Sequence, residues 1–142
     1  MGLDCYIVHG NDRDKAFTSK DDDRIENVQL CGGLFSGNGF DGSFRGKVYD
    51  PLIQELSEGQ HTWYIDQEDE DAYIPSDTLK EQADILSTFI TDTIEEHGDL
   101  DDEDTVYITH DGWAEYTLKE VRDLETLLRV AAERRAVMCV WY

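Results

Sequence analysis

The chain has few of the residues that mark secreted, membrane-spanning or nucleic-acid-binding proteins. Of its 142 residues, three are cysteine and 12 are lysine or arginine. The odd number and wide spacing of Cys5, Cys31 and Cys139 favour free thiols in a reducing cytoplasm, and their apolar neighbours predict that all three are buried. The first ten residues lack a basic segment followed by a long apolar run, so we expect no signal peptide and no membrane span.

The scarcity of basic residues limits the partners that the chain can bind. Its 33 acidic residues give a formal net charge of -21. Binding to DNA or RNA needs a basic surface that contacts phosphates, and anionic lipids attract the same basic residues. We therefore expect no direct nucleic-acid binding and no membrane binding, and we expect a cytoplasmic location.

Short motifs of catalytic and metal sites are also missing. The sequence contains no HExxH, no CxxC and no GxSxG, which are the patterns of zinc proteases, zinc or redox sites and serine hydrolases. Cys5 and His9 have the spacing C-x-x-x-H, but on a strand they would lie roughly 13 Å apart, too far to share a metal ion. The alternating acids at 66–70 and 99–105 lack the glycine and final glutamate of an EF-hand. We expect no metal and no cofactor, and catalysis is not favoured.

One glycine-rich stretch comes close to two ligand-binding motifs. Residues 37–42, GNGFDG, satisfy G-x-G-x-x-G, but a dinucleotide site needs a helix that begins on the motif. Residues 42–48 approach the phosphate loop G-x-x-x-x-G-K-[ST], but they are one residue short, and Val48 replaces the hydroxyl. Arg45 and Lys47 could still hold a small anion beside glycine amides. The alternative is an ordinary turn in which both cations pair with acids.

Two histidines follow the same kind of predicted strand. His9 ends the strand predicted at 3–10, and His110 ends the strand predicted at 105–110. If these strands were parallel neighbours, both imidazoles would lie at one sheet edge, where Asp111 could orient one of them for acid–base chemistry. The alternative is that the histidines are structural. The candidate ligand site then comprises Gly37, Asn38, Gly39, Arg45, Lys47, His9 and His110.

Hydrophobic periodicity predicts a single α+β domain over residues 1–142. Strands are predicted at 3–10, 26–36, 61–66, 105–110 and 136–142. Long helices are predicted over 76–97, with Ser76 or Thr78 as the cap, and over 117–135; a Thr-Leu-Lys-Glu capping box occurs near the start of each. A short helix follows Asp50 as N-cap with Pro51 at its first position, or else begins kinked near Ser43.

We expect these elements to form one mixed sheet of four to five strands, with the two long helices and the short helix packed on it. A three-layer α/β arrangement is the alternative. The expected core contains Leu3, Tyr6, Val8, Leu30, Leu79, Leu86, Ile90, Val106, Ile108, Leu124, Leu128, Val137 and Val140.

Negative charge is concentrated in the middle of the chain. Residues 61–104 carry 16 acids and one base, whereas residues 105–142 carry six acids and five bases. Five acids of the helix predicted at 76–97 share one face opposite its apolar side: Asp77, Glu81, Asp84, Asp92 and Glu95. A general adaptation for solubility would spread acids evenly. We therefore favour a non-catalytic interaction module that presents a negative surface to a basic protein partner, in one version by imitating a nucleic acid. The alternatives are a merely solvated surface, or a small-ligand-binding or enzymatic domain with its site at the glycine-rich turn.

Overall fold

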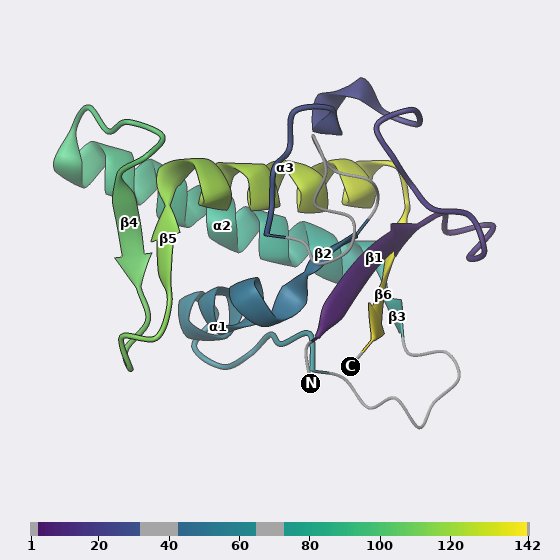
Figure 1. Cartoon of the computed structure of the whole chain (residues 1–142), viewed down its shortest axis with the longest axis horizontal. Coiled ribbons are helices and arrows are strands. Elements are labelled where there is room, and N and C mark those ends of the chain that lie inside the picture. Colours follow the sequence, from purple (N-terminus) through teal and green to yellow (C-terminus); the bar gives the residue numbers. More distant parts are fainter. Residues whose placement is uncertain (1–2, 32–42, 65–72, 142) are drawn as a thin grey trace.

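The computed structural model describes residues 3–31, 43–64 and 73–141 of the chain (Figure 1). Within these residues the order of elements is β1 (Asp4–Val8), η1 (Asp23–Ile25), β2 (Ser43–Arg45), α1 (Gly46–Leu56), β3 (Tyr73–Ile74), α2 (Ser76–His97), β4 (Thr105–Ile108), β5 (Glu115–Thr117), α3 (Leu118–Glu133) and β6 (Val137–Trp141). The predicted α+β class is confirmed. None of the described helices has the length and apolar character needed to cross a bilayer.

The strands form two antiparallel sheets in place of the one mixed sheet that we predicted. The larger sheet has the order β2-β1-β6-β3, and β4 pairs only with β5. β1 occupies an inner position, where Cys5 lies opposite Phe44 of β2 and Val140 of β6. The predicted strand at 105–110 does not join the main sheet because the tight turn after it favours local pairing with β5. With no parallel pair among these strands, the three-layer α/β alternative is also wrong.

The two long helices connect the two sheets. Figure 1 shows α2 and α3 side by side and antiparallel, with the four-stranded sheet at one end and the β4–β5 hairpin at the other. Their bounds match the prediction closely, and α3 begins with the predicted capping box between Thr117 and Glu120. At α2, however, Pro75 is the N-cap and no side chain caps the helix. The predicted cap at Ser76 or Thr78 is therefore wrong.

Helix α1 begins before the position that its proline suggested. It starts at Gly46, so Pro51 lies inside it, as in the kinked-helix alternative. Asp50 does not cap the helix. Its fully buried carboxylate accepts hydrogen bonds from the Trp63 backbone N–H at 2.6 Å, from Thr62 Oγ1 at 2.9 Å and from Gln54. These buried hydrogen bonds to Asp50 stabilise a helix that begins before Pro51, and they outweigh the preference of proline for the first helical position.

Gly46 allows α1 to approach β1 closely. A Cβ atom at this position would lie 2.4 Å from Cys5 Sγ, which is closer than real Cβ atoms come to another heavy atom. Cys5 is fully buried beneath it, and burial raises the pKa of the Cys5 thiol well above its usual value. Cys139 is half-buried, but Cys31 is exposed, so the prediction that all three cysteines are buried is wrong for Cys31.

Two predicted strands are absent from the described residues. Residues 26–31 form a turn and irregular chain after η1, and residues 61–64 have no ladder partner. The remaining parts of these predictions, 32–36 and 65–66, lie outside the described residues. Apolar side chains at 61–64 serve another purpose, because the Trp63 indole is buried and donates to Gln82 Oε1 of α2 at 2.9 Å. Local apolar content thus indicated burial but not a strand.

The core lies where the larger sheet, α1 and the inner faces of α2 and α3 meet. Leu3, Cys5 and Ile7 are fully buried, so alternate residues from Leu3 onward point into the core. Tyr6, which we expected in the core, is only half-buried. Ile108 is 52% exposed, so its predicted place in the core is wrong. Five aromatic residues that we did not predict fill much of the interior: Phe17, Phe44, Tyr49, Trp63 and Tyr116.

Candidate functional site

The first candidate site is the outer face of α2. All five acids of the predicted stripe are exposed, and the buried positions of α2, including Leu79, Ala83 and Leu86, lie on the opposite side. Glu81 lies 3.6 Å from His61, and Asp84 lies 3.0 Å from Arg129 of α3. Among the described residues, Asp77, Asp92 and Glu95 have no ion-pair partner. We call this set of five acids the acidic face.

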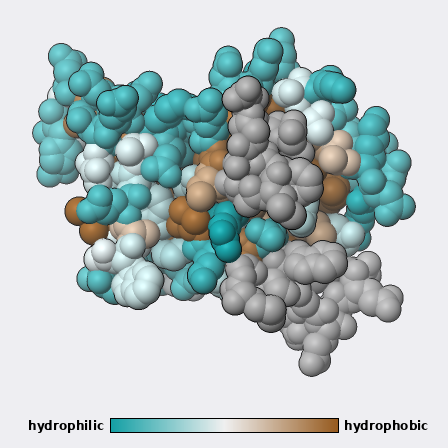
Figure 2. All heavy atoms as spheres, in the orientation of Figure 1, coloured by the Kyte–Doolittle hydropathy of each residue, from teal (hydrophilic) through white to brown (hydrophobic). Residues whose placement is uncertain are grey.

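An acidic loop continues the negative charge beyond the end of α2. Gly98 ends the helix with φ +76°, and residues 99–104 carry five exposed acids. The loop is anchored at its far end, where the backbone N–H groups of Leu118 and Lys119 donate to the carbonyls of Asp104 and Asp102. Figure 2 shows hydrophilic side chains covering this end of the molecule. The loop therefore has a defined position beside the acidic face.

The acids of α3 are arranged differently, because each has a partner. Glu125 pairs with Arg129 at 2.6 Å, Asp123 pairs with Lys119 at 2.5 Å, and Glu133 pairs with Arg24. Glu120 completes the capping box and also accepts from the Tyr49 hydroxyl at 3.0 Å. Of the described cations of α3, Lys119 and Arg129 pair with acids of the same helix, and Arg129 also reaches Asp84 on the acidic face of α2. Arg122 pairs with Asp102 of the loop 99–104 at 3.4 Å.

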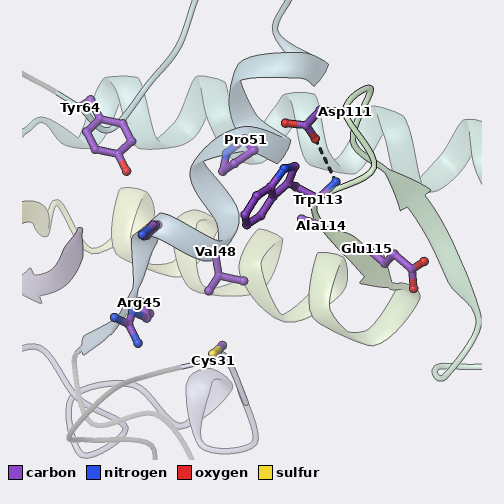
Figure 3. A pocket seen from close by; sticks show the side chains of 10 residues that line it. Cys31, Arg45, Val48, Pro51, Tyr64, Asp111, Trp113, Ala114 and Glu115 are labelled. Atoms are coloured by element: carbon purple, nitrogen blue, oxygen red, sulfur yellow. Dashed lines mark hydrogen bonds between the residues drawn. The ribbon is translucent and has the colours of Figure 1, made fainter. Parts of the chain in front are cut away.

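The second candidate site is an open pocket of ≈ 720 Å³ between the start of α1 and the β4–β5 turn. Arg45, Lys47, Val48 and Pro51 line it from one side, and Trp113 lines it from the turn. Figure 3 shows the indole turned toward Pro51 and Val48, while Arg45 lies toward the opposite end. The remaining lining residues are Cys31, Tyr64, Asp111, Ala114 and Glu115.

The β4–β5 turn is fixed to α1 by Glu55. The carboxylate of Glu55 accepts from the Tyr107 hydroxyl at 2.9 Å and from the His110 backbone N–H at 3.0 Å. Burial, together with this carboxylate, raises the pKa of Tyr107 to about 12. Asp111 accepts from Thr109 Oγ1 at 2.7 Å and from the Trp113 backbone N–H at 3.0 Å, and these hydrogen bonds lower the pKa of Asp111. The backbone that carries Trp113 is therefore held in place.

Two buried tyrosines fix the other side of the pocket. The Tyr49 hydroxyl accepts from the Cys31 backbone N–H at 2.9 Å while it contacts Glu120, and the Tyr116 hydroxyl donates to the Val48 carbonyl at 2.6 Å. Burial raises the pKa of both phenols above their usual range, so both remain protonated donors. Because these contacts are buried and satisfied, they hold the pocket wall rigid.

The structure brings together only part of the predicted ligand site. Arg45 and Lys47 share the pocket with Asp111, which follows His110 in the chain. His110 itself points to Glu55, with Nδ1 3.6 Å from Oε1. His9 follows β1 of the other sheet, and its Nε2 lies 3.2 Å from Asp21 Oδ2. The premise of parallel neighbouring strands is wrong, and Gly37, Asn38 and Gly39 lie outside the described residues.

Within the described residues, the part of the glycine-rich stretch that approaches the phosphate-loop pattern does not form such a loop. Residues 43–45 form β2 and Gly46 begins α1, so strand and helix follow each other without a loop between them. Gly46 is needed for its close approach to Cys5. In the described part of the chain, no group of three or more histidine, cysteine or acidic side chains is placed to hold a metal ion.

The sequence did not identify Trp113, Pro51 or Tyr64 as site residues. Trp113 is 87% exposed, which is unusual for so large an apolar side chain, and it stands after an Asp-Gly turn. That local pattern was the only available signal, because Pro51 and Tyr64 reach the pocket through non-local packing. Comparison with protein-family models, curated proteins and solved structures found no match for the chain.

Proposed function

We propose that the chain is a non-catalytic interaction module of the cytoplasm that binds a basic surface of a partner protein through the acidic face of α2. The observation that carries this proposal is the exposure of five acids along one side of a helix, three of which have no counter-ion among the described residues. The adjoining loop 99–104 extends the same charge. Such a surface attracts cations at long range and accelerates their encounter.

A basic partner removes electrostatic repulsion that already exists along α2. Asp77 and Glu81 are spaced i,i+4, and Asp92 and Glu95 are spaced i,i+3. Like charges at these spacings each destabilise a helix by roughly 0.2–0.5 kcal/mol. Cations placed between them convert this repulsion into attraction, so binding gains more than a salt bridge to an already paired acid would give.

Charge density favours a basic protein surface over a strict imitation of nucleic acid. From Asp77 to Glu95 the helix rises about 27 Å, so its charges follow one another at roughly 7 Å. Duplex DNA carries one charge per ≈ 1.7 Å of axis, and a single strand one per ≈ 3.4 Å. The density of negative charge along α2 is therefore lower than the density along a nucleic acid, so a protein that requires the latter would bind α2 only weakly.

The proposal is tested with two variants that remove the same charge from different places. One carries D77N, E81Q, D92N and E95Q on the acidic face, and the other carries D14N, D23N, E26Q and E58Q at exposed positions elsewhere. Binding of a short lysine- and arginine-rich peptide is measured by calorimetry at low salt and at about 0.15 M ionic strength, where screening acts within ≈ 8 Å.

We expect the face variant to weaken binding about tenfold and to reduce its salt dependence, while the control variant changes affinity less than about twofold. Circular dichroism establishes that both variants retain the fold. Equal loss in the two variants would mean that net charge alone attracts the peptide, and the acidic face would then have no special role.

A further inference from the structure

We propose that the pocket beside Trp113 binds a planar aromatic ring that carries an anionic group, a phosphate or a carboxylate. This site is separate from the acidic face, because it uses other residues and binds an anion, whereas the acidic face binds a basic protein surface. It retains Arg45 and Lys47 from the predicted ligand site and replaces the histidines with Trp113.

The cationic end of the pocket is the first observation. Arg45 and Lys47 are both exposed and both line the pocket, and neither forms an ion pair with a carboxylate of the described residues. Among the described residues, five of the chain's 12 lysines and arginines form ion pairs with carboxylates: Arg24, Lys119, Arg122, Arg129 and Arg134. Two neighbouring cations without such partners provide the charge that an anion requires.

The aromatic end is the second observation. The Trp113 indole is 87% exposed, yet its backbone is held by Asp111 and by the clamp of Glu55 on the turn. An exposed indole on a held backbone, beside Pro51 and Val48, offers an apolar platform on which a planar ring stacks (Figure 3). The pocket volume of ≈ 720 Å³ is in the range of small-ligand sites.

The charges along the pocket determine how the ligand lies. Asp111 and Glu115 line the pocket close to Trp113 in sequence and repel an anion at that end. Arg45 and Lys47 attract it at the start of α1, so the ring lies on the indole and the anionic group points away from the β4–β5 turn. A ring without the anion, or an anion without the ring, uses only half of these contacts.

The experiment titrates the full chain with four probes: adenosine monophosphate, naphthalene-2-carboxylate, adenosine and inorganic phosphate. Affinity is measured by calorimetry, and tryptophan fluorescence is followed in parallel. We expect one or both aromatic anions to bind at least about tenfold more tightly than adenosine and phosphate.

Variants assign the binding to the two ends of the pocket. R45Q/K47Q and W113A should each weaken the aromatic anion about tenfold, and W113F should restore part of the loss. The matched control K20Q/R135Q removes the same two kinds of cation at exposed positions away from the pocket and should change affinity less than about twofold.

Two results would overturn the proposal. One is that the aromatic anions bind no more tightly than adenosine and phosphate. The other is that R45Q/K47Q weakens binding no more than K20Q/R135Q does. A change of oligomeric state in W113A, seen by sedimentation with no effect of any probe, would instead assign Trp113 to a contact between two copies of the chain and would likewise overturn it.

Discussion

Helices α2 and α3 pack against each other through similar apolar faces, but their outer faces differ in how the acidic residues are paired. Both bury leucines at helical spacing, and the tetrapeptide Thr-Leu-Lys-Glu occurs near the start of each, within α2 and across the N-cap of α3. On α3 every acid has a partner, whereas on α2 only Glu81 and Asp84 have one among the described residues. The difference shows that the negative charge of the chain is neutralised where it supports the fold and left free along one side.

The repeated tetrapeptide gives a second lesson from the same pair. At 117–120 it forms a capping box, with Thr117 Oγ1 accepting from the Glu120 backbone N–H at 3.2 Å. At 78–81 the same residues lie inside α2, because Pro75 already ends the extended segment and the helix begins at Ser76. A capping motif therefore acts only where the chain before it is not helical.

The largest expected effect concerns the faces that the two helices share. L86A in α2 and L124A in α3 each remove a fully buried side chain, and each should lower the free energy of unfolding by about 2–5 kcal/mol. Urea denaturation measures both values. I108A, at a position that is 52% exposed, is the control and should change stability by less than about 1 kcal/mol. A small effect for only one leucine would show that the inner faces are not equivalent.

A smaller effect should separate the two copies of the tetrapeptide. T117A removes the N-cap of α3 and should cost about 1 kcal/mol of unfolding free energy. T78A removes no cap and should be neutral or slightly stabilising, since alanine favours a helix interior over threonine. The measurement is the shift of the denaturation midpoint at constant slope. Equal losses in the two variants would contradict the assignment of Pro75 as the N-cap of α2.

The smallest effect should have opposite signs on the two outer faces. D92N relieves repulsion with Glu95 and should stabilise the chain by a few tenths of a kcal/mol at low salt. E125Q breaks the i,i+4 pair with Arg129 and should destabilise it by a similar amount. Both differences should shrink as salt is added, because exposed charges are screened. Effects of the same sign would remove the contrast between the faces.

The long helices were predictable because their signals are repeated over several turns. The predicted range 76–97 coincides with α2, where the apolar face persists until Gly98. The strands at 43–45, 73–74 and 115–117 were missed because two or three residues are too short to show a period of two. The start of α1 was misplaced because the contact that decides it, between Asp50 and Trp63, joins residues that are not neighbours in sequence.

The two candidate sites also differ in how far the sequence predicted them. The acidic face was predictable, since helical spacing alone places its five acids on one side. The pocket was predictable only in its cations, Arg45 and Lys47. Trp113 reaches the pocket because Glu55 holds the β4–β5 turn against α1, and no local pattern encodes that contact. His9 was included in the prediction only because a parallel pairing was assumed, and that pairing does not occur.

The close approach of Gly46 to Cys5 supplies the molecule with a built-in reporter of opening. A thiol reagent can reach Cys31 in the folded chain, but it reaches Cys5 only when α1 separates from β1. The rate at which Cys5 becomes alkylated therefore records how often this part of the core opens, without any introduced label. Mass spectrometry of the peptides that contain Cys5 and Cys31 would compare the opening rate of this part of the core with the direct alkylation of an exposed thiol in the same sample.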